Sequence, residues 1–181
     1  MPGIVLIRHP EVSEACRGVC YGRLDVPLSE RGLARIAGIV ASLTAVTAVV
    51  HSGATRSRLL AEAIARHFGI EPAVEVRLAE RDFGAWEGRP WEDIYAETGD
   101  AMMGMVTDPA AWCPHGGETT FQLRDRVLAW YHEQTSPVVA VTHGGPIAAL
   151  VGPLGGHPVA DWLRLVPPCG GVVVVPLPAG R

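Results

Sequence analysis

The sequence predicts an α/β fold, a three-layer sandwich in which a mainly parallel sheet is covered by helices on both faces. Short apolar, β-branched runs alternate along the chain with amphipathic stretches of helical spacing. The apolar runs are continuous instead of alternating with polar residues, which is typical of strands buried on both faces. Because no repeat, low-complexity segment or linker interrupts the pattern, we expect residues 1–181 to form a single domain.

Four runs are predicted as buried strands, and a fifth, shorter run is a weaker candidate for a strand. In order along the chain they are residues 3–7, 46–51, 74–76 (the weaker one), 138–142 and 171–176. Strands of this kind, separated by helices, are joined by crossover connections. The carboxyl ends of such strands form the edge of the sheet where ligands bind.

Helices are predicted between the strands. Ser29 is a candidate N-cap for a helix with Leu33, Ala37 and Leu43 on its apolar face. The second helix spans residues 55–68 and ends at a glycine. Three further helices are expected at residues 90–97, 118–133 and 146–151.

The composition limits the chemistry. All 15 basic residues are Arg, and neither Lys nor Asn occurs, so no Lys Schiff base or phosphate-loop Lys is possible. A bound anion must therefore be held by Arg, His, hydroxyl or backbone N–H groups. The net charge of −4 argues against nucleic acid or an anionic membrane as the partner. No apolar run approaches the ~18 residues of a membrane span and no leader peptide is recognisable, so a cytoplasmic location is expected.

Polar residues gather at three strand ends. Arg8 and His9 follow the first strand, Arg56 begins the helix after the second, and His143 and Gly144 follow the fourth of the apolar runs. Each alone is compatible with a structural role, since a single His at a strand end is often merely hydrogen-bonded. Together, beside helix N-termini that attract anions, they predict a phosphate-binding pocket.

In the order of their motifs, these residues resemble the histidine phosphatase superfamily, also called phosphoglycerate-mutase-like. The matches run from Leu6 to Gly145 and are highly specific as an ordered set. They are Leu6-Ile7-Arg8-His9-Pro10-Glu11, the stretch from Cys20 to Ser29, His51-Ser52-Gly53-Ala54-Thr55-Arg56, the stretch from Glu80 to Gly88, Pro114-His115-Gly116-Gly117-Glu118-Thr119, and Thr142-His143-Gly144-Gly145.

The resemblance implies a phosphatase that forms a covalent phosphohistidine on His9. Glu80 is then the general acid, with Asp82 as the alternative. The phosphoryl group and substrate are expected to contact Arg8, Arg56, His143, Gly144, Arg23 and Tyr21. The tautomer of His9 should be fixed by a hydrogen bond to a backbone carbonyl, nearby guanidinium groups should lower its pKa, and His143 should act as a cation.

The stretch from Tyr21 to Ser29 most resembles the α-ribazole phosphatase branch, which acts in cobalamin assembly. Pro10, Val12 and Ala15 depart from the pattern of the superfamily, which usually has a phosphate-touching Asn at the position of Ala15. Three alternatives stay open: mutase-type phosphoryl transfer, a protein phosphohistidine phosphatase, and a non-catalytic binder of a phosphate ligand.

The middle segment, about residues 85–117, is implied by the resemblance to cap the pocket. Its aromatic and Met side chains either offer stacking surface to a substrate ring or simply form core. No metal or other cofactor is implied, because the carboxylates and His115 show no ligand spacing. The expected partner is a small-molecule phosphate ester, and a homodimer is left open.

Overall fold

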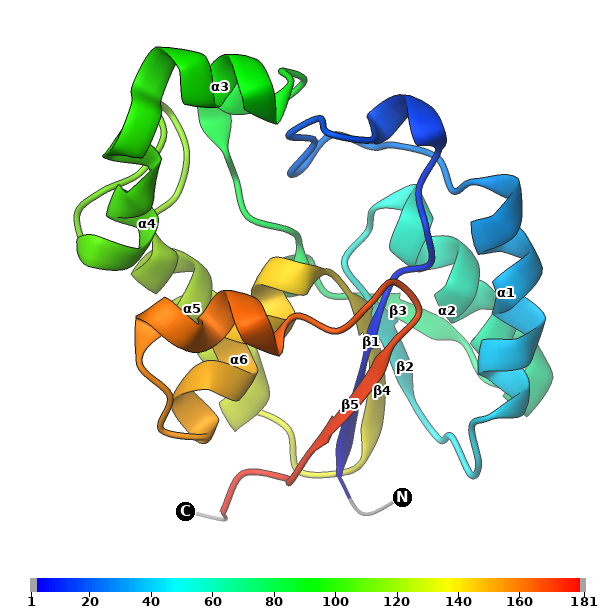
Figure 1. Ribbon diagram of the computed structural model, residues 1–181. Coiled ribbons are helices and arrows are strands. Elements are labelled where there is room, and N and C mark those ends of the chain that lie inside the picture. Colours follow the sequence, from blue (N-terminus) through cyan, green and yellow to red (C-terminus); the bar gives the residue numbers. More distant parts are fainter. Residues whose placement is uncertain (1–2, 180–181) are drawn as a thin grey trace.

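The computed structural model describes residues 3–179 and contains a five-stranded sheet enclosed by helices (Figure 1). The spatial order is β3-β2-β4-β1-β5, and all neighbours are parallel except β5, which runs antiparallel to β1. The mainly parallel sheet is therefore confirmed. The strands are β1 (Ile4–Arg8), β2 (Val49–His51), β3 (Pro72–Val74), β4 (Val138–Thr142) and β5 (Val172–Val175).

Two pairs of helices complete the three predicted layers. Alternate residues of β1 supply the two cores: Val5 and Ile7 pack with α1 (Glu30–Ala41) and α2 (Thr55–Phe68). Ile4 and Leu6 pack with the helices of the other face, α5 (Thr120–His132) and α6 (Gly144–Leu154). Because β1 and β4 are covered on both faces, the interpretation of their continuous apolar runs is confirmed.

The predicted helix ends are only partly correct. Ser29 caps α1 as expected, since its hydroxyl accepts a 2.9 Å hydrogen bond from Gly32 N–H. The helix predicted from residue 118 begins at Thr120, because Thr119 forms a capping box with Gln122. The helix predicted from residue 146 already begins at Gly144, directly after the extended His143, and runs to Leu154.

The predicted apolar face of α1 is wrong in part. Leu33 is 48% exposed, and Ala37 is exposed as well. The first turn of α1 lies against backbone, since a Cβ on Gly32 would approach the Glu11 carbonyl oxygen to 2.2 Å. The residues of α1 that pack with the sheet are Ile39 and Val40, and Leu43 joins them just after the helix ends.

Three strand predictions also need correction. The run predicted at 46–51 is paired only over β2, and the one predicted at 74–76 lies at 72–74, because Val76 begins a 3₁₀ turn, η2 (Val76–Leu78). The run predicted at 171–176 is β5, but it is not buried on both faces. Val172 and Val174 are 43% and 53% exposed because the core formed by α1 and α2 does not reach this edge strand, whereas Val173 and Val175 pack with the core of the other face.

The middle of the chain forms a separate layer of short helices beyond the carboxyl ends of the parallel strands, at the upper left of Figure 1. It contains η3 (Gly84–Trp86), α3 (Trp91–Thr98), η4 (Gly99–Met103) and α4 (Gly104–Thr107). Pro90, predicted as the first residue of a helix, is the N-cap of α3. Among residues 3–179, none of the helices has the length and apolar character that a membrane span requires.

Candidate active site

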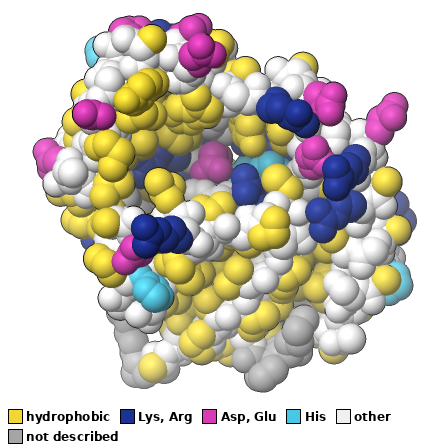
Figure 2. Space-filling view, in the orientation of Figure 1, with side chains coloured by type: hydrophobic (Ala, Val, Ile, Leu, Met, Phe, Trp, Pro, Cys, Tyr) yellow, Lys and Arg dark blue, Asp and Glu magenta, His cyan; other side chains and the backbone are white. Residues whose placement is uncertain are grey.

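The four predicted phosphate-pocket residues meet at the carboxyl ends of the strands. Arg8 is the last residue of β1 and His9 follows it, His143 is the N-cap of α6 after β4, and Arg56 lies in the first turn of α2. His9, Arg56 and His143 are no more than 1% exposed. In Figure 2, Arg, His and acidic side chains lie in the depth of a hollow whose walls are largely hydrophobic.

His9 is held as a neutral imidazole with one free nitrogen. Its Nδ1 lies 2.7 Å from the Pro10 carbonyl oxygen, which can only accept, so Nδ1 carries the proton. Nε2 is left with the lone pair that a nucleophile needs. Burial lowers the pKa of His9 to about 3, with smaller contributions from the guanidinium groups of Arg56 and Arg8. The pKa of His9 is lowered as predicted, but the main cause is burial and not the charge of the guanidinium groups.

His143 is also held in its neutral form, and the cation expected against a bound phosphoryl group stays a prediction. Its ring lies 5.1 Å from that of His9, centroid to centroid. Arg56 Nε–H donates to His143 Nδ1 across 3.2 Å, so Nδ1 holds a lone pair. The physical cause is burial, which together with the nearby His9 and Arg56 lowers the pKa of His143 well below its usual value.

A chain of hydroxyl groups fixes the other nitrogen of His143. His143 Nε2 lies 2.7 Å from Ser52 Oγ, which lies 2.7 Å from Ser57 Oγ. Ser57 uses its proton to donate to the Ala54 carbonyl at 2.8 Å, so Ser57 accepts from Ser52 and Ser52 accepts from His143. Neither serine is predicted from the sequence as a site residue, although Ser52 lies in the motif that ends at Arg56 and Ser57 directly follows it.

Arg56 orders the loop that follows the first motif. Its Nη1 donates to Leu24 O and its Nη2 to Gly22 O, each across 2.6 Å. Its guanidinium also lies 5.1 Å from the centre of the Tyr21 ring. Because its Nε–H also donates to His143, the buried Arg56 side chain connects His143 with the loop that contains Tyr21.

Arg8 and Gly144 form the adjoining wall. Arg8 Nη1 donates to the Pro167 carbonyl across 2.8 Å, whereas its buried Nε has no partner in the described part of the chain. A Cβ on Gly144 would lie 2.8 Å from Val166 Cγ1 and 3.6 Å from Arg8 Cζ. The glycine therefore lets the positive N-terminus of α6 approach the Arg8 guanidinium closely.

Glu80 has the environment of a proton donor. Its Oε1 accepts a 2.8 Å hydrogen bond from Arg81 N–H, and its Oε2 lies 3.5 Å from Gly145 N. Burial raises the pKa of this carboxyl, against the opposing effects of those N–H groups and of the nearby arginines. A carboxyl that keeps its proton to higher pH is suited to protonate a leaving group.

Asp82, the alternative acid, is engaged elsewhere. Its Oδ1 accepts from Gly84 N at 2.9 Å, and its Oδ2 lies 3.0 Å from Arg23 Nη1. The predicted ligand Arg23 is exposed and also lies 3.9 Å from Glu118, so it belongs to an ion-pair group at the surface and does not line the cavity described below. The geometry favours Glu80 over Asp82.

A buried ion pair that sequence reasoning missed supports Glu80. Arg126 Nη2 donates to Glu118 Oε1 at 2.7 Å and to the Glu80 carbonyl at 3.0 Å. Glu118 Oε1 also accepts from Asp82 N at 2.9 Å. The pair thus fixes the backbone on both sides of Arg81. The only sign of this ion pair in the sequence is Glu118, which lies in the motif Pro114–Thr119.

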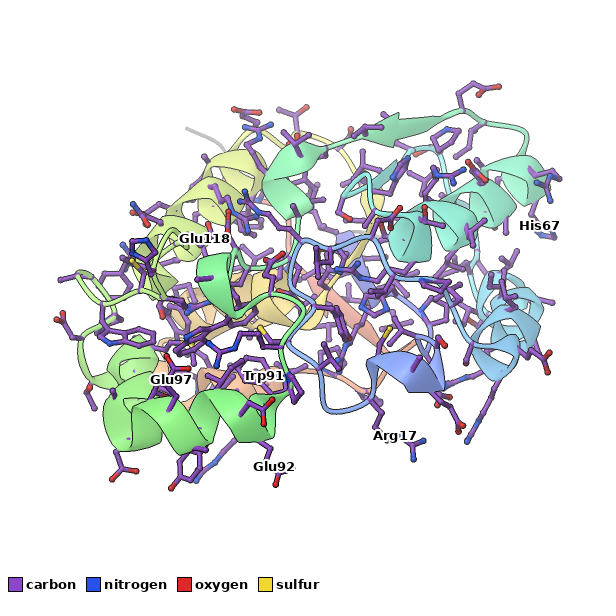
Figure 3. All side chains as sticks on the ribbon, turned by 90° about the horizontal axis from the view of Figure 1, so that it is seen from above. Arg17, His67, Trp91, Glu92, Glu97 and Glu118 are labelled. Atoms are coloured by element: carbon purple, nitrogen blue, oxygen red, sulfur yellow. The ribbon has the colours of Figure 1, made fainter. Side chains whose placement is uncertain are left out.

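A cavity of about 460 Å³ lies beside this site, but His9, Arg56 and His143 are not among the residues that line it. Arg8, Tyr21, Glu80 and Gly144 line it on the side of the histidines, and Trp91 and Met105 of the middle segment line it elsewhere. Figure 3 shows Trp91 on the side of α3 that faces the rest of the molecule.

The aromatic and Met side chains of the middle segment divide between a small core and the wall of the cavity, and their role as stacking surface for a substrate ring stays a prediction. Trp86 is 6% exposed and packs with Trp112 in a small core of this layer, whereas Trp91, Met102 and Met105 contact that core and also line the cavity.

Two of the departures from the superfamily pattern lie outside the cavity. Ala15 is exposed in η1 (Glu14–Cys16), and Val12 pairs with Leu28, so neither lines the cavity. Pro10 does participate, but through its carbonyl oxygen and not through the N–H that it lacks. Within residues 3–179, no group of three or more His, Cys, Asp or Glu side chains is placed to hold a metal ion.

Comparison with known proteins agrees with this geometry. The Histidine phosphatase superfamily (branch 1) matches residues 4–180. A glucosyl-3-phosphoglycerate phosphatase from Mycolicibacterium vanbaalenii is 33% identical over 173 residues, covering 88% of this chain and 76% of the relative. Its counterpart from Mycobacterium tuberculosis is 32% identical over 177 residues, covering 90% and 79%.

A solved structure is similar over nearly the whole chain. The mycobacterial glucosyl-3-phosphoglycerate phosphatase in complex with VO3 superposes with a TM-score of 0.82 at 26% identity, covering 99% of this chain and 100% of that one. These relatives do not confirm the predicted α-ribazole branch, which stays a prediction. With a family match over almost the full length and a site of two neutral histidines, two arginines and a buried carboxyl, the chain is a phosphatase that belongs to the histidine phosphatase superfamily, branch 1.

Proposed function

We propose that the protein hydrolyses a small phosphate monoester through a covalent phosphohistidine on His9. The observation that carries this proposal is the 2.7 Å contact between His9 Nδ1 and the Pro10 carbonyl, which leaves Nε2 unprotonated. Nε2 attacks phosphorus, the bond from phosphorus to the ester oxygen breaks, and the Glu80 proton passes to the departing alkoxide. Water then attacks the phosphohistidine, Glu80 takes up one of its protons, and phosphate leaves with His9 restored.

Arg8, Arg56 and His143 stabilise the phosphoryl oxygens in this scheme. A phosphate monoester carries about two negative charges near neutral pH. Arg8 has a buried Nε without a protein partner, and the N-terminus of α6 at Gly144 offers N–H groups. The incoming negative charge raises the pKa of His143, and a proton taken from solvent at Nδ1 would replace the hydrogen bond from Arg56 Nε, which would then be free to bind the phosphoryl group. Tyr21 packs beside Arg56 and lines the cavity, which supports a role for it in contacting the alcohol part of the ester.

Two hypotheses differ in the alcohol that the substrate carries as its ester group. Residues 21–29 resemble the α-ribazole phosphatases, whereas the relatives compared above are named for glucosyl-3-phosphoglycerate. The segment of residues 85–117 acts as the cap that selects between such alcohols, because Trp91 and Met105 line the cavity.

Phosphate release from a panel of monoesters tests the proposal. The panel contains α-ribazole 5′-phosphate, glucosyl-3-phosphoglycerate, 3-phosphoglycerate and sugar phosphates, with His9→Ala as the control. We expect turnover of at least one ester and none by His9→Ala. Transfer to an acceptor alcohol with little free phosphate would indicate a mutase, activity only on a phosphorylated protein would indicate a phosphohistidine phosphatase, and tight binding without turnover would indicate a binder. The oligomeric state, for which a homodimer is left open, is measured by sedimentation in the same preparation.

A further inference from the structure

Glu87 has no role in the proposed mechanism, although its carboxylate lies between two loops of the site. One of its oxygens, Oε1, accepts a hydrogen bond from Arg23 N–H at 2.9 Å and another from Phe83 N–H at 3.1 Å. Arg23 belongs to the turn of residues 21–24, and Phe83 belongs to the loop that precedes α3. A single carboxylate oxygen therefore joins this turn to that loop.

The turn of residues 21–24 is shaped to lie against Glu87. A 2.7 Å hydrogen bond from Leu24 N–H to the Tyr21 carbonyl closes it. Gly22 has a φ of +38°, and a Cβ at this position would collide with the Glu87 carboxylate. Only glycine lets the backbone approach the carboxylate this closely.

The other side of the turn binds the Arg56 guanidinium. The Gly22 and Leu24 carbonyls each accept from one terminal nitrogen of Arg56 at 2.6 Å, and Arg56 Nε–H donates to His143. Arg56 is 0% exposed and makes no salt bridge to a carboxylate among residues 3–179. The two carbonyls of the turn therefore determine where this buried cation lies.

Both ends of the turn are attached independently of Glu87. Before it, the Cys20 carbonyl accepts a 2.7 Å hydrogen bond from Gly88 N–H. After it, the Asp25 carboxylate accepts from Thr55 N–H at 2.8 Å and from the Thr55 hydroxyl at 2.7 Å. Loss of the Glu87 carboxylate should therefore displace the turn without unfolding the chain around it.

We propose that Glu87 is a positioning residue for phosphoryl binding: its carboxylate fixes the turn of residues 21–24, and the carbonyls of that turn hold Arg56 where it meets the phosphoryl group. The inference rests on the proposed function, because Arg56 is assigned there to the phosphoryl oxygens. Preorganisation of this kind favours binding, since a guanidinium that is already held in place loses little side-chain entropy.

The affinity for inorganic phosphate tests the proposal, because phosphate carries no alcohol and reports on the phosphoryl site alone. Its Kd is measured by isothermal titration calorimetry, together with kcat/KM for p-nitrophenyl phosphate. Glu87→Ala removes the acceptor, whereas Glu87→Gln keeps an oxygen that can accept from both N–H groups. Glu97→Ala is the matched control, because Glu97 forms an exposed ion pair with Arg89 in the same part of the chain and does not line the cavity.

We expect Glu87→Ala to raise the Kd and to lower kcat/KM by about 10- to 100-fold, since it removes a charged hydrogen-bond acceptor. Glu87→Gln and Glu97→Ala should stay within about threefold of the wild type. Wild-type affinity in Glu87→Ala, or an affinity in Glu87→Gln as low as in Glu87→Ala, would overturn the proposal. If Glu87→Ala does not fold, Glu87→Asp replaces it, with the same expected direction because the shorter side chain withdraws the carboxylate from the turn.

A double variant tests whether Glu87 acts through Arg56. The single ammonium of Arg56→Lys cannot be held by both carbonyls of the turn, so adding Glu87→Ala to Arg56→Lys should change the Kd for phosphate little further. A loss in the double variant equal to the product of the two single losses would show independent action and would reject the positioning role.

Failure of this inference can be distinguished from failure of the proposed function. Wild-type phosphate affinity in Glu87→Ala, together with a phosphoenzyme formed from p-nitrophenyl phosphate, would reject the role of Glu87 and retain the phosphatase mechanism. A phosphate affinity that depends on Glu87 and Arg56 as expected, without turnover or a phosphoenzyme in the wild type, would retain the positioning role and reject the mechanism.

Discussion

Replacing Glu80 by Gln removes the proposed proton donor while retaining its shape. The amide oxygen of Gln can still accept the 2.8 Å hydrogen bond from Arg81 N–H, so the loop should keep its position. General acid catalysis contributes about 10²–10⁴ in rate, which corresponds to about 3–5 kcal/mol of transition-state stabilisation. We therefore expect kcat for an alkyl phosphate to fall by about that factor.

The loss should depend on the leaving group. The p-nitrophenolate ion departs without protonation, so Glu80→Gln should retain most of its activity on p-nitrophenyl phosphate. Asp82→Asn is the matched control, with the same change from carboxyl to amide two residues away, and its effect should be small and equal for both esters. An equal loss on both esters in Glu80→Gln, or a leaving-group dependence in Asp82→Asn, would refute the assignment of the acid.

The pH profile provides a second test of the same residue. Glu80 acts when protonated and burial raises its pKa, so kcat for alkyl phosphates should fall as pH rises through that pKa. This limb should vanish in Glu80→Gln. Because the pKa of His9 is lowered to about 3, protonation of the nucleophile in the free enzyme should limit kcat/KM only near and below that pH.

Stability should change in the opposite direction to activity. The folded-state pKa of Glu80 lies above its unfolded value, so the ionised carboxyl destabilises the fold at pH values above the unfolded pKa of about 4.3. Glu80→Gln should therefore melt at the same or a higher temperature at pH 7, and this gain should disappear in acid. A lower melting temperature at pH 7 would show that the buried carboxylate is favourably paired.

Three further substitutions address the surroundings of the site. In Arg56→Lys, one ammonium cannot hold both the Gly22 and Leu24 carbonyls and His143, so kcat/KM should fall by about 10²–10³; a change below tenfold would contradict the assigned role. Ser57→Ala leaves the Ser52 hydroxyl without its acceptor and should lower the free energy of unfolding by about 1–3 kcal/mol in urea, together with kcat. Leu60→Ala empties a fully buried position and should cost about 2–5 kcal/mol without changing KM; a change in KM would show that α2 shifts.

The sequence was sufficient to predict the layers and most of the parallel sheet, because their signals are local. Continuous apolar runs and capping residues such as Ser29 directly reflect burial and hydrogen bonding. It failed where burial depends on neighbours distant in the chain. Leu33 has helical spacing yet is exposed because Gly32 lies against the Glu11 backbone, and Val174 has strand character yet is exposed because β5 is at the edge.

The candidate site likewise contains residues that could be predicted from the sequence and residues that could not. Arg8, Arg56, His9 and His143 could be predicted because the ends of parallel strands bring them together. The supporting groups could not, since hydrogen bonds across more than thirty residues leave no local pattern. The contact of Arg126 with the Glu80 carbonyl and the hydrogen bond between Ser52 and His143 are both of this kind.

The central claim is that His9 Nε2 becomes phosphorylated during turnover. The most direct measurement mixes the enzyme rapidly with an excess of p-nitrophenyl phosphate, quenches the reaction in alkali, and locates the phosphoryl group by peptide mass spectrometry. The account predicts a phosphoryl group on the His9 peptide that is lost in acid, and none in His9→Ala, in line with the single lone pair left by the Pro10 contact. Full turnover with no phosphoryl group on His9, or an active His9→Ala, would contradict it.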